Sequence, residues 1–249
     1  MDSREILLDP TTTALILIDL QNGMVHLPHA PRTGYQVVGV ARRLADHFRK
    51  LNAPVVLVNV SYPLNRRPVA DMPMPPLPDT MPSGWDSIVV ELGQQDSDIQ
   101  ITKHGWGAFT STQLDNELGM RGISSIVLAG IATNFGVEQT AREALQLGYE
   151  VVCVSDAMAS LSKAHHDFAI EHIFPLVGRV RTSERNPRPA GSIASGLPQS
   201  VAALHRCSGR AARRQATDRG VGDLAANLGP PRWTDRAAAG ARLQGPVCE

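Results

Sequence analysis

The chain has 249 residues, of which 43% are hydrophobic and 19% charged, and its acidic and basic side chains are equal in number. This composition excludes a chain that is disordered throughout, and it supplies enough apolar surface for a hydrophobic core. No apolar run reaches the roughly 18 residues of a membrane span, and the first residues, MDSREILLDP, lack the layout of a signal peptide. We therefore expect a cytoplasmic protein with no membrane partner.

Charge divides the chain near residue 184. Residues 1–184 contain 14 Lys and Arg against 20 Asp and Glu, whereas residues 185–249 contain 10 Arg against 4 acidic residues and no Lys, Phe or Tyr. We interpret 1–184 as the folded domain. The Arg/Ala/Gly/Pro-rich remainder is interpreted as a tail that is either disordered or the product of out-of-frame translation. Its scattered charges and its lone aromatic residue, Trp233, argue against nucleic-acid binding.

Apolar runs and stretches with helical periodicity alternate along residues 14–182. Strands are expected at 14–20, 54–60, 99–103, 124–129, 150–154 and 179–182, and helices at 36–51, 112–118, 134–147 and 163–174. Residues 61–98 are long and proline-rich, which is typical of a substrate-covering loop or a disordered excursion. The alternation predicts an α/β fold in which helices cover both faces of a mostly parallel sheet.

Three segments carry polar or small residues to the carboxyl edge of this sheet, where ligands bind in such folds. Asp19 closes the first strand, Lys103 closes the third, and the turn at 130–136 follows the fourth. An Asp and a Lys in a partly dry site would keep one another ionised, although two incidental strand-end charges are the plainer interpretation. Asn134 is placed to cap a helix whose first amides face the same pocket.

The segments ALILIDLQNGMV, ITKHGWGAFTSTQLDNEL and VLAGIATNFGVEQTAREALQLGYEVVCVSDA resemble the isochorismatase-like superfamily, also called cysteine hydrolases. The resemblance covers about residues 10–182 and implies a three-layer α/β/α sandwich and a homo-oligomer. Amidase members use an Asp, a Lys and a Cys, so it implies Asp19 and Lys103 as catalytic residues. It also implies a cis peptide that contributes to an oxyanion hole, at Ala132 and Thr133.

Gly136 stands where the amidases carry their cysteine, so no thioester can form there. The block TNFGVE resembles orphan members of the family that have no assigned reaction. Isochorismatases proper also carry glycine at this place and cleave a vinyl ether, which requires a proton donor and water. We therefore predict a cysteine-independent hydrolase with Asp19 as acid and Lys103 orienting Asp19 or a substrate carboxylate. A silent small-molecule-binding pseudoenzyme, or an amidase with another nucleophile such as Thr133, remain alternatives.

Further residues are expected to line a small-molecule site. Trp106 and Phe109 would form a flat wall suited to an aromatic or cyclic substrate, with core packing as the alternative. Gln21 would bind a substrate carbonyl or cap the following turn. The predicted substrate-lining set is Gln21, Trp106, Phe109, Asn134 and Phe135.

We predict no metal and no other cofactor. The metal-binding Asp-x-His-x-His pattern of nicotinamidases is replaced here by SYPLN at 61–65. His165 and His166 lie in a helical stretch of surface type and are expected to be solvated. The three cysteines lack the spacing of a zinc site or a disulfide framework, and Cys153 is expected to be a small buried strand residue.

Overall fold

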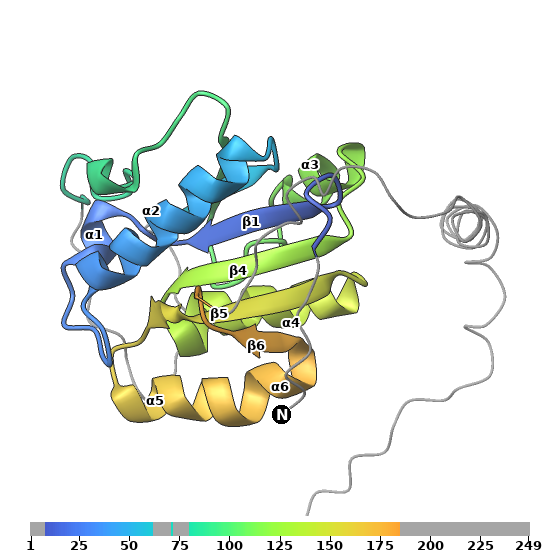
Figure 1. Ribbon diagram of the computed structural model, residues 1–249. Helices are drawn as coiled ribbons and strands as arrows, with labels where there is room; N and C mark the ends of the chain where they lie inside the picture. Colours follow the sequence, from blue (N-terminus) through green and yellow to red (C-terminus); the bar gives the residue numbers. More distant parts are fainter. Residues whose placement is uncertain (1–7, 62–70, 72–79, 185–249) are drawn as a thin grey trace, which may run out of the picture. The chain divides into compact units, whose positions relative to one another are not determined.

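The computed structural model describes residues 8–61, 71 and 80–184 (Figure 1). One six-stranded sheet with strand order β3-β2-β1-β4-β5-β6 forms its centre, and every pairing is parallel. The strands are β1 (Thr13–Ile18), β2 (Val55–Val60), β3 (Ile99–Lys103), β4 (Ser125–Ile131), β5 (Glu150–Ala159) and β6 (Arg179–Arg181). The tail predicted at 185–249, and residues 62–70 and 72–79 of the proline-rich segment, lie outside the described residues.

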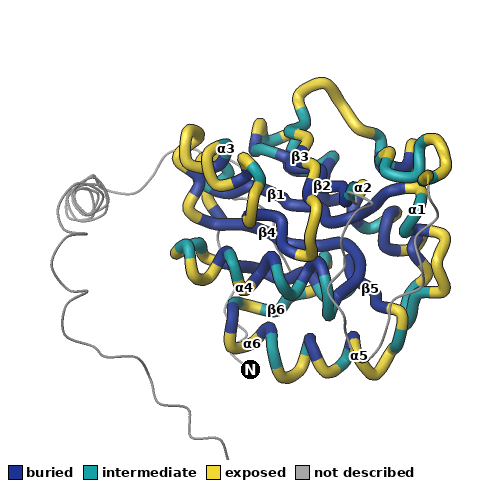
Figure 2. Tube along the Cα trace, turned by 180° about the vertical axis from the view of Figure 1, so that it is seen from behind, coloured by how far each residue is buried: buried dark blue, intermediate teal, exposed yellow. Residues whose placement is uncertain are grey.

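Helices cover both faces of the sheet, as expected. The α-helices are α1 (Asn22–Val25), α2 (Gly34–Lys50), α3 (Leu114–Met120), α4 (Glu138–Gln146), α5 (Lys163–Phe168) and α6 (Phe174–Val177). Figure 1 shows α2 across one face, and Figure 2, seen from behind, shows α3 and α4 on the other. The fold is therefore a three-layer α/β/α sandwich. None of the described helices has the length and apolarity to cross a bilayer.

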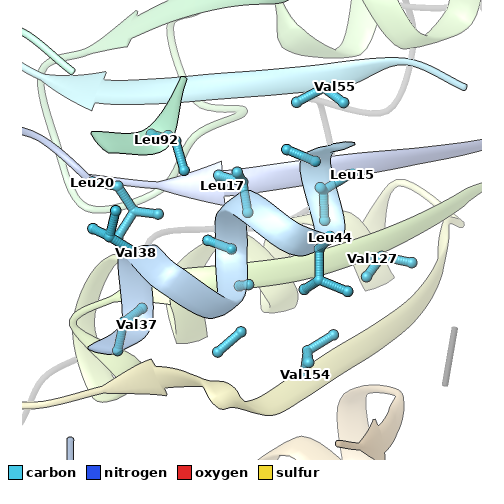
Figure 3. Close-up of a cluster of buried hydrophobic side chains, with 14 of the residues drawn as sticks. Leu15, Leu17, Leu20, Val37, Val38, Leu44, Val55, Leu92, Val127 and Val154 are labelled. Atoms are coloured by element: carbon cyan, nitrogen blue, oxygen red, sulfur yellow. The ribbon is translucent and has the colours of Figure 1, made fainter. Parts of the chain in front are cut away.

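The central strands are apolar on both sides because each side faces a helical layer. Side chains alternate along β1, so Leu15 and Leu17 join the core beneath α2 (Figure 3). Ile16 and Ile18 point the opposite way and join the second core, beneath α3 and α4. The continuous apolar run of β1, without polar alternation, follows from this double burial.

Several elements have bounds that differ from the prediction. The helix expected at 134–147 begins as a π-helical turn, η2 (Thr133–Val137), before α4, and the strand expected at 150–154 continues to Ala159. The pairing of β4 with β5 shifts register between Leu128 and Gly130. At Gly130, with φ of 126°, an added Cβ would lie 2.2 Å from the carbonyl oxygen of Ile18, so only glycine fits where β4 bends past β1.

The helices near 112 and 163 also shift. The hydroxyl of Thr112 accepts a hydrogen bond from the Leu114 amide, and this local turn delays the start of α3. The stretch predicted at 163–174 runs as α5, a π-helical turn η3 (Ala169–Ile173) and α6, and it ends at Val177. A short 3-10 turn, η1 (Val90–Leu92), precedes β3.

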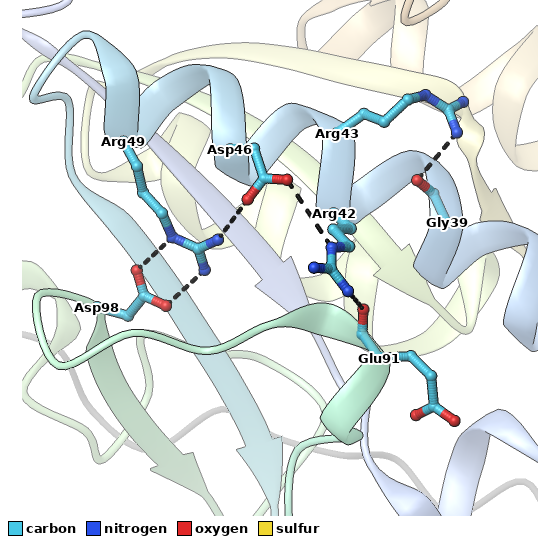
Figure 4. Close-up of polar contacts among 7 residues, drawn as sticks. All are labelled: Gly39, Arg42, Arg43, Asp46, Arg49, Glu91 and Asp98. Carbon is cyan, nitrogen blue, oxygen red and sulfur yellow. Dashed lines mark hydrogen bonds and ion pairs between the residues drawn. The ribbon is translucent and has the colours of Figure 1, made fainter.

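A charged clamp ties α2 to the segment before β3 at the amino edge of the sheet (Figure 4). Arg49 binds both carboxylate oxygens of Asp98, at 3.0 and 2.6 Å, and it also contacts Asp46 at 3.0 Å. The side chains of Arg49 and Asp98 are 8% and 1% exposed. An open depression of about 330 Å³ lies here, lined by Asp46, Arg49, Lys50 and Gln95. The carboxylates of Asp98 and Asp46 occupy three of the five N–H groups of the Arg49 guanidinium, and the depression borders this clamp.

Candidate active site

The candidate site lies at the carboxyl end of β1, where the chain connections to the neighbouring strands run to opposite sides of the sheet. From β1 the chain passes to β2 and β3 on one side, and it returns to β4 on the other side of β1. Ligands of open α/β sheets bind at such a switch point, beyond the carboxyl ends of the strands. Asp19 follows β1 there with a φ of 53°, a left-handed conformation that few residues other than glycine adopt, while its amide still donates to the carbonyl of Val58 at 2.8 Å.

Asp19 and Lys103 meet in a buried ion pair. Nζ of Lys103 donates to Oδ2 of Asp19 at 2.9 Å and to the carbonyl oxygen of Gly105 at 3.0 Å. The two side chains are 6% and 1% exposed. The second carboxylate oxygen, Oδ1, is buried and has no hydrogen-bond partner among the residues that the structure describes. Burial raises the pKa of Asp19 to about 6, against the opposing effect of Lys103.

Gly136 places backbone directly against this carboxyl group. A Cβ at Gly136 would lie 3.1 Å from Oδ2 of Asp19 and 3.4 Å from the carbonyl oxygen of Trp106. The position of Gly136, where the resemblance places the cysteine of the amidases, therefore borders the carboxyl group of Asp19.

Helix α4 holds the segment that follows Lys103. The carboxylate of Glu143 accepts hydrogen bonds from the Phe109 amide at 2.9 Å and from the Thr110 hydroxyl at 2.6 Å. Its neighbour Thr140 accepts from the Ala108 amide at 3.2 Å and donates to the carbonyl oxygen of Gly136 at 2.6 Å. These bonds fix the segment over the turn, and Glu143 and Thr140 were not anticipated from the sequence.

Aromatic rings lie beside the turn on its solvent side. Trp106 is 49% exposed, and its ring packs edge-on against Phe135 with 5.1 Å between centroids. Phe135 and Asn134 are half-buried. These three members of the predicted substrate-lining set thus lie in or beside the turn that contains Gly136, and their contact with a substrate stays a prediction.

Two members of that set have structural roles instead. Gln21 is fully buried, and its side-chain amide binds the backbone of Val60 on both sides, accepting at 2.7 Å and donating at 3.0 Å. It also donates to the carbonyl of Trp85 at 3.4 Å, so both ends of its amide have internal partners. Phe109 is 7% exposed and belongs to the core beneath α3, with its ring 5.5 Å from that of Tyr149. Internal partners therefore use both side chains, and for Phe109 this is the core packing that was kept as the alternative.

The cis peptide lies one bond earlier than expected. It joins Ile131 to Ala132 instead of Ala132 to Thr133. The carbonyl of Ala132 accepts the amides of Phe135 and Val137, at 3.1 and 3.3 Å, so the bond after Ala132 already belongs to the turn.

His166 is buried, which overturns the expectation that it is solvated. It is 5% exposed, and its Nδ1 lies 2.8 Å from Oγ1 of the fully buried Thr133. The sequence did carry a signal for this contact. His166 precedes Ala169, Phe174 and Val177 at helical spacings, and all three are core residues.

No cysteine or metal cluster completes the site within the described ranges. Cys153 is buried in the middle of β5, and burial raises the pKa of its thiol to about 12. Residues 8–61, 71 and 80–184 contain no group of three His, Cys, Asp or Glu side chains able to hold a metal ion.

Comparison with known proteins places this chain in a family. Residues 13–185 match the isochorismatase domain. The uncharacterized isochorismatase family protein YwoC of Bacillus subtilis (strain 168) is 44% identical over 180 residues, which cover 71% of this chain and 93% of YwoC. The ureidoacrylate amidohydrolase RutB of Agrobacterium fabrum (strain C58 / ATCC 33970) is 29% identical over 177 residues, covering 61% of this chain and 78% of RutB.

A solved structure agrees. An isochorismatase family protein from Burkholderia thailandensis superimposes with a TM-score of 0.69 at 44% identity, over 73% of this chain and 96% of that protein. The matched range of the family domain contains Asp19, Lys103 and Gly136. This chain belongs to the isochorismatase family of hydrolases.

Proposed function

We propose that this protein hydrolyses a small carboxylated or cyclic metabolite without a cysteine nucleophile, with Asp19 as the acid and base and Lys103 as its partner. The observation that carries the proposal is the buried Asp19–Lys103 pair beside Gly136, in which one carboxyl oxygen accepts no hydrogen bond from the described part of the chain. A pKa of about 6 lets this carboxyl group both hold and release a proton near neutral pH.

Hydrolysis of a vinyl ether fits these groups. Asp19 delivers its proton to the enol carbon, and the electron pair of the C=C bond forms the new C–H bond, leaving an oxocarbenium ion. Water adds to the cationic carbon and returns a proton to Asp19, after which the hemiketal breaks its C–O bond to give a carbonyl compound and an alcohol. Lys103 stabilises the carboxylate between the two proton transfers.

The surroundings of Asp19 support a flat or cyclic substrate. Trp106 and Phe135 form an aromatic pair at the mouth of the site, and Gly136 lets the backbone approach the carboxyl group closely. Gly136 supplies no side-chain nucleophile, and in the proposed route water attacks the substrate itself.

An amidase that uses Thr133 is the second candidate. The Thr133 hydroxyl lies 2.8 Å from a histidine nitrogen, a spacing typical of a nucleophile and its base, and the relative RutB is named an amidohydrolase. Thr133 is fully buried, however, which leaves a substrate no access to its hydroxyl. A binding protein without activity is the third candidate, and the retained buried charge pair argues against it, because an unused pair only costs desolvation energy.

Turnover of isochorismate, nicotinamide and several carbamoyl amides by the purified protein tests the proposal. We expect isochorismate cleavage that falls by about 10²-fold or more in Asp19→Asn and is unchanged in Asp96→Asn, an exposed control. Amide cleavage that survives Asp19→Asn and disappears in Thr133→Val would establish the second candidate. A compound that raises the melting temperature without being consumed would establish the third.

A further inference from the structure

The pair Thr133–His166 forms a second buried polar contact at the candidate site. Thr133 is the first residue of η2, the turn that contains Gly136, and His166 lies in α5. Within the described residues, the hydroxyl of Thr133 has no acceptor other than Nδ1 of His166, at 2.8 Å. A neutral ring with its proton on Nε2 can accept this bond, whereas a protonated ring cannot.

The charges around His166 favour the neutral ring. Burial lowers the pKa of His166, and the positive charges of Arg32 and Lys163 lower it further, while Asp167 acts in the opposite direction. Lys163 and Asp167 are themselves joined in an exposed ion pair. The imidazole is therefore neutral at pH 7.5, and its Nδ1 can accept a hydrogen bond from the Thr133 hydroxyl.

The next residue of the turn is anchored from the same segment. The hydroxyl of Ser160 donates to Oδ1 of Asn134. Thr133 and Asn134 are thus each bound by a side chain from the segment that runs from the end of β5 into α5. On the other side of the turn, Thr140 binds the carbonyl oxygen of Gly136 at 2.6 Å. The turn is therefore held at Thr133, at Asn134 and at Gly136 itself.

We propose that His166 is a positioning residue for the candidate site, which holds Thr133 and through it the turn that presents Gly136 to Asp19. The inference rests on the proposed function only in treating this turn as part of the site. A role in packing alone would require the shape of the two side chains and not their hydrogen bond. Replacement of both partners by apolar groups of similar shape is close to neutral for stability, so packing and positioning can be separated.

Nuclear magnetic resonance of protein with ¹⁵N-labelled backbone and histidines tests the proposal at pH 7.5. We expect the wild-type His166 ring to be neutral with its proton on Nε2. Thr133→Val should mix the two neutral tautomers, and Thr133→Ser should restore the wild-type signal. In the double variant Thr133→Val/His166→Leu, we expect a retained melting temperature together with a shifted Gly136 amide resonance.

His172→Leu, at a 62%-exposed histidine of the same helical stretch, is the matched control and should leave the Gly136 resonance in place. A wild-type His166 ring that is protonated, or that carries its proton on Nδ1, would overturn the proposal without any variant. An unshifted Gly136 amide in a folded double variant would also overturn it. None of these readouts requires turnover. They therefore test the role of His166 even if the protein hydrolyses no compound in the panel.

Discussion

Replacing Lys103 by methionine removes the partner of a buried carboxyl group. The side chains of Lys103 and Asp19 are 1% and 6% exposed, and their ion pair spans 2.9 Å. Methionine keeps most of the length and packing of lysine but supplies no charge. Loss of one member of a buried pair costs about 3–5 kcal/mol of the free energy of unfolding, because the remaining charge is uncompensated.

The loss of unfolding free energy in Lys103→Met depends on pH, and the direction of this dependence follows from the pKa of Asp19. Its pKa rises from an ordinary 3.8 to about 6 in the folded protein, so the folded state holds the proton more tightly than the unfolded state. Stability contributed by this proton is therefore full below about pH 4 and is lost as the pH rises through 6, a change of about 3 kcal/mol. Without Lys103 the pKa of Asp19 rises above 6, and the variant keeps losing stability over a higher pH range.

Urea unfolding at pH 5.0 and pH 8.5 measures this effect. We expect Lys103→Met to lose about 3–5 kcal/mol at pH 8.5 and clearly less at pH 5.0, where Asp19 is protonated in both proteins. Lys163→Met is the control, since the Lys163–Asp167 pair is 67% and 36% exposed and should contribute less than about 1 kcal/mol. An equal loss at the two pH values would refute the reasoning.

Three further outcomes follow from the structure. In urea unfolding, Arg49→Met should lower the free energy of unfolding by about 3–5 kcal/mol, because it leaves the buried Asp98 without its ionic partner. Arg121→Met, at an exposed pair, should lower it by less than about 1 kcal/mol. Similar losses in the two variants would contradict a stabilising role for the clamp. Gly130→Ala should fail to give soluble folded protein, judged by circular dichroism, because its Cβ would meet backbone at 2.2 Å; a native spectrum would contradict this. Iodoacetamide should leave turnover unchanged, since burial raises the pKa of Cys153 to about 12; inactivation would point to a thiol.

The fold was predictable because its strands are buried on both faces. The runs ALILIDL and PVVLVNV in the sequence place β1 and β2 without further information, and β6 lies at the sheet edge as expected. The bounds that differed depend on contacts between distant segments. The end of β5 pairs with β4 beyond a register shift, with Met158 and Ala159 opposite Gly130 and Ile131, and no local propensity encodes this pairing.

At the candidate site, the residues that end strands were easier to predict than the residues that support them through hydrogen bonds or packing. Asp19 and Lys103 came together because parallel strands share a carboxyl edge. Gln21 and Phe109 are polar or aromatic neighbours of these residues in the sequence, but only the folded structure reveals that internal partners use them. The burial of His166 was not predictable from its immediate neighbours, which are polar, because the core residues at helical spacing from it lie further along the chain, at Ala169, Phe174 and Val177.

The pKa of the Asp19 carboxyl group in the resting protein tests the central claim most directly. It can be measured by ¹³C nuclear magnetic resonance over pH 3 to 9, with the signal assigned by its absence in Asp19→Asn. We predict a pKa of about 6, which makes Asp19 a proton donor and acceptor near neutral pH. A pKa at or below the ordinary value of 3.8 would leave Asp19 a permanent carboxylate and would contradict its role as the acid.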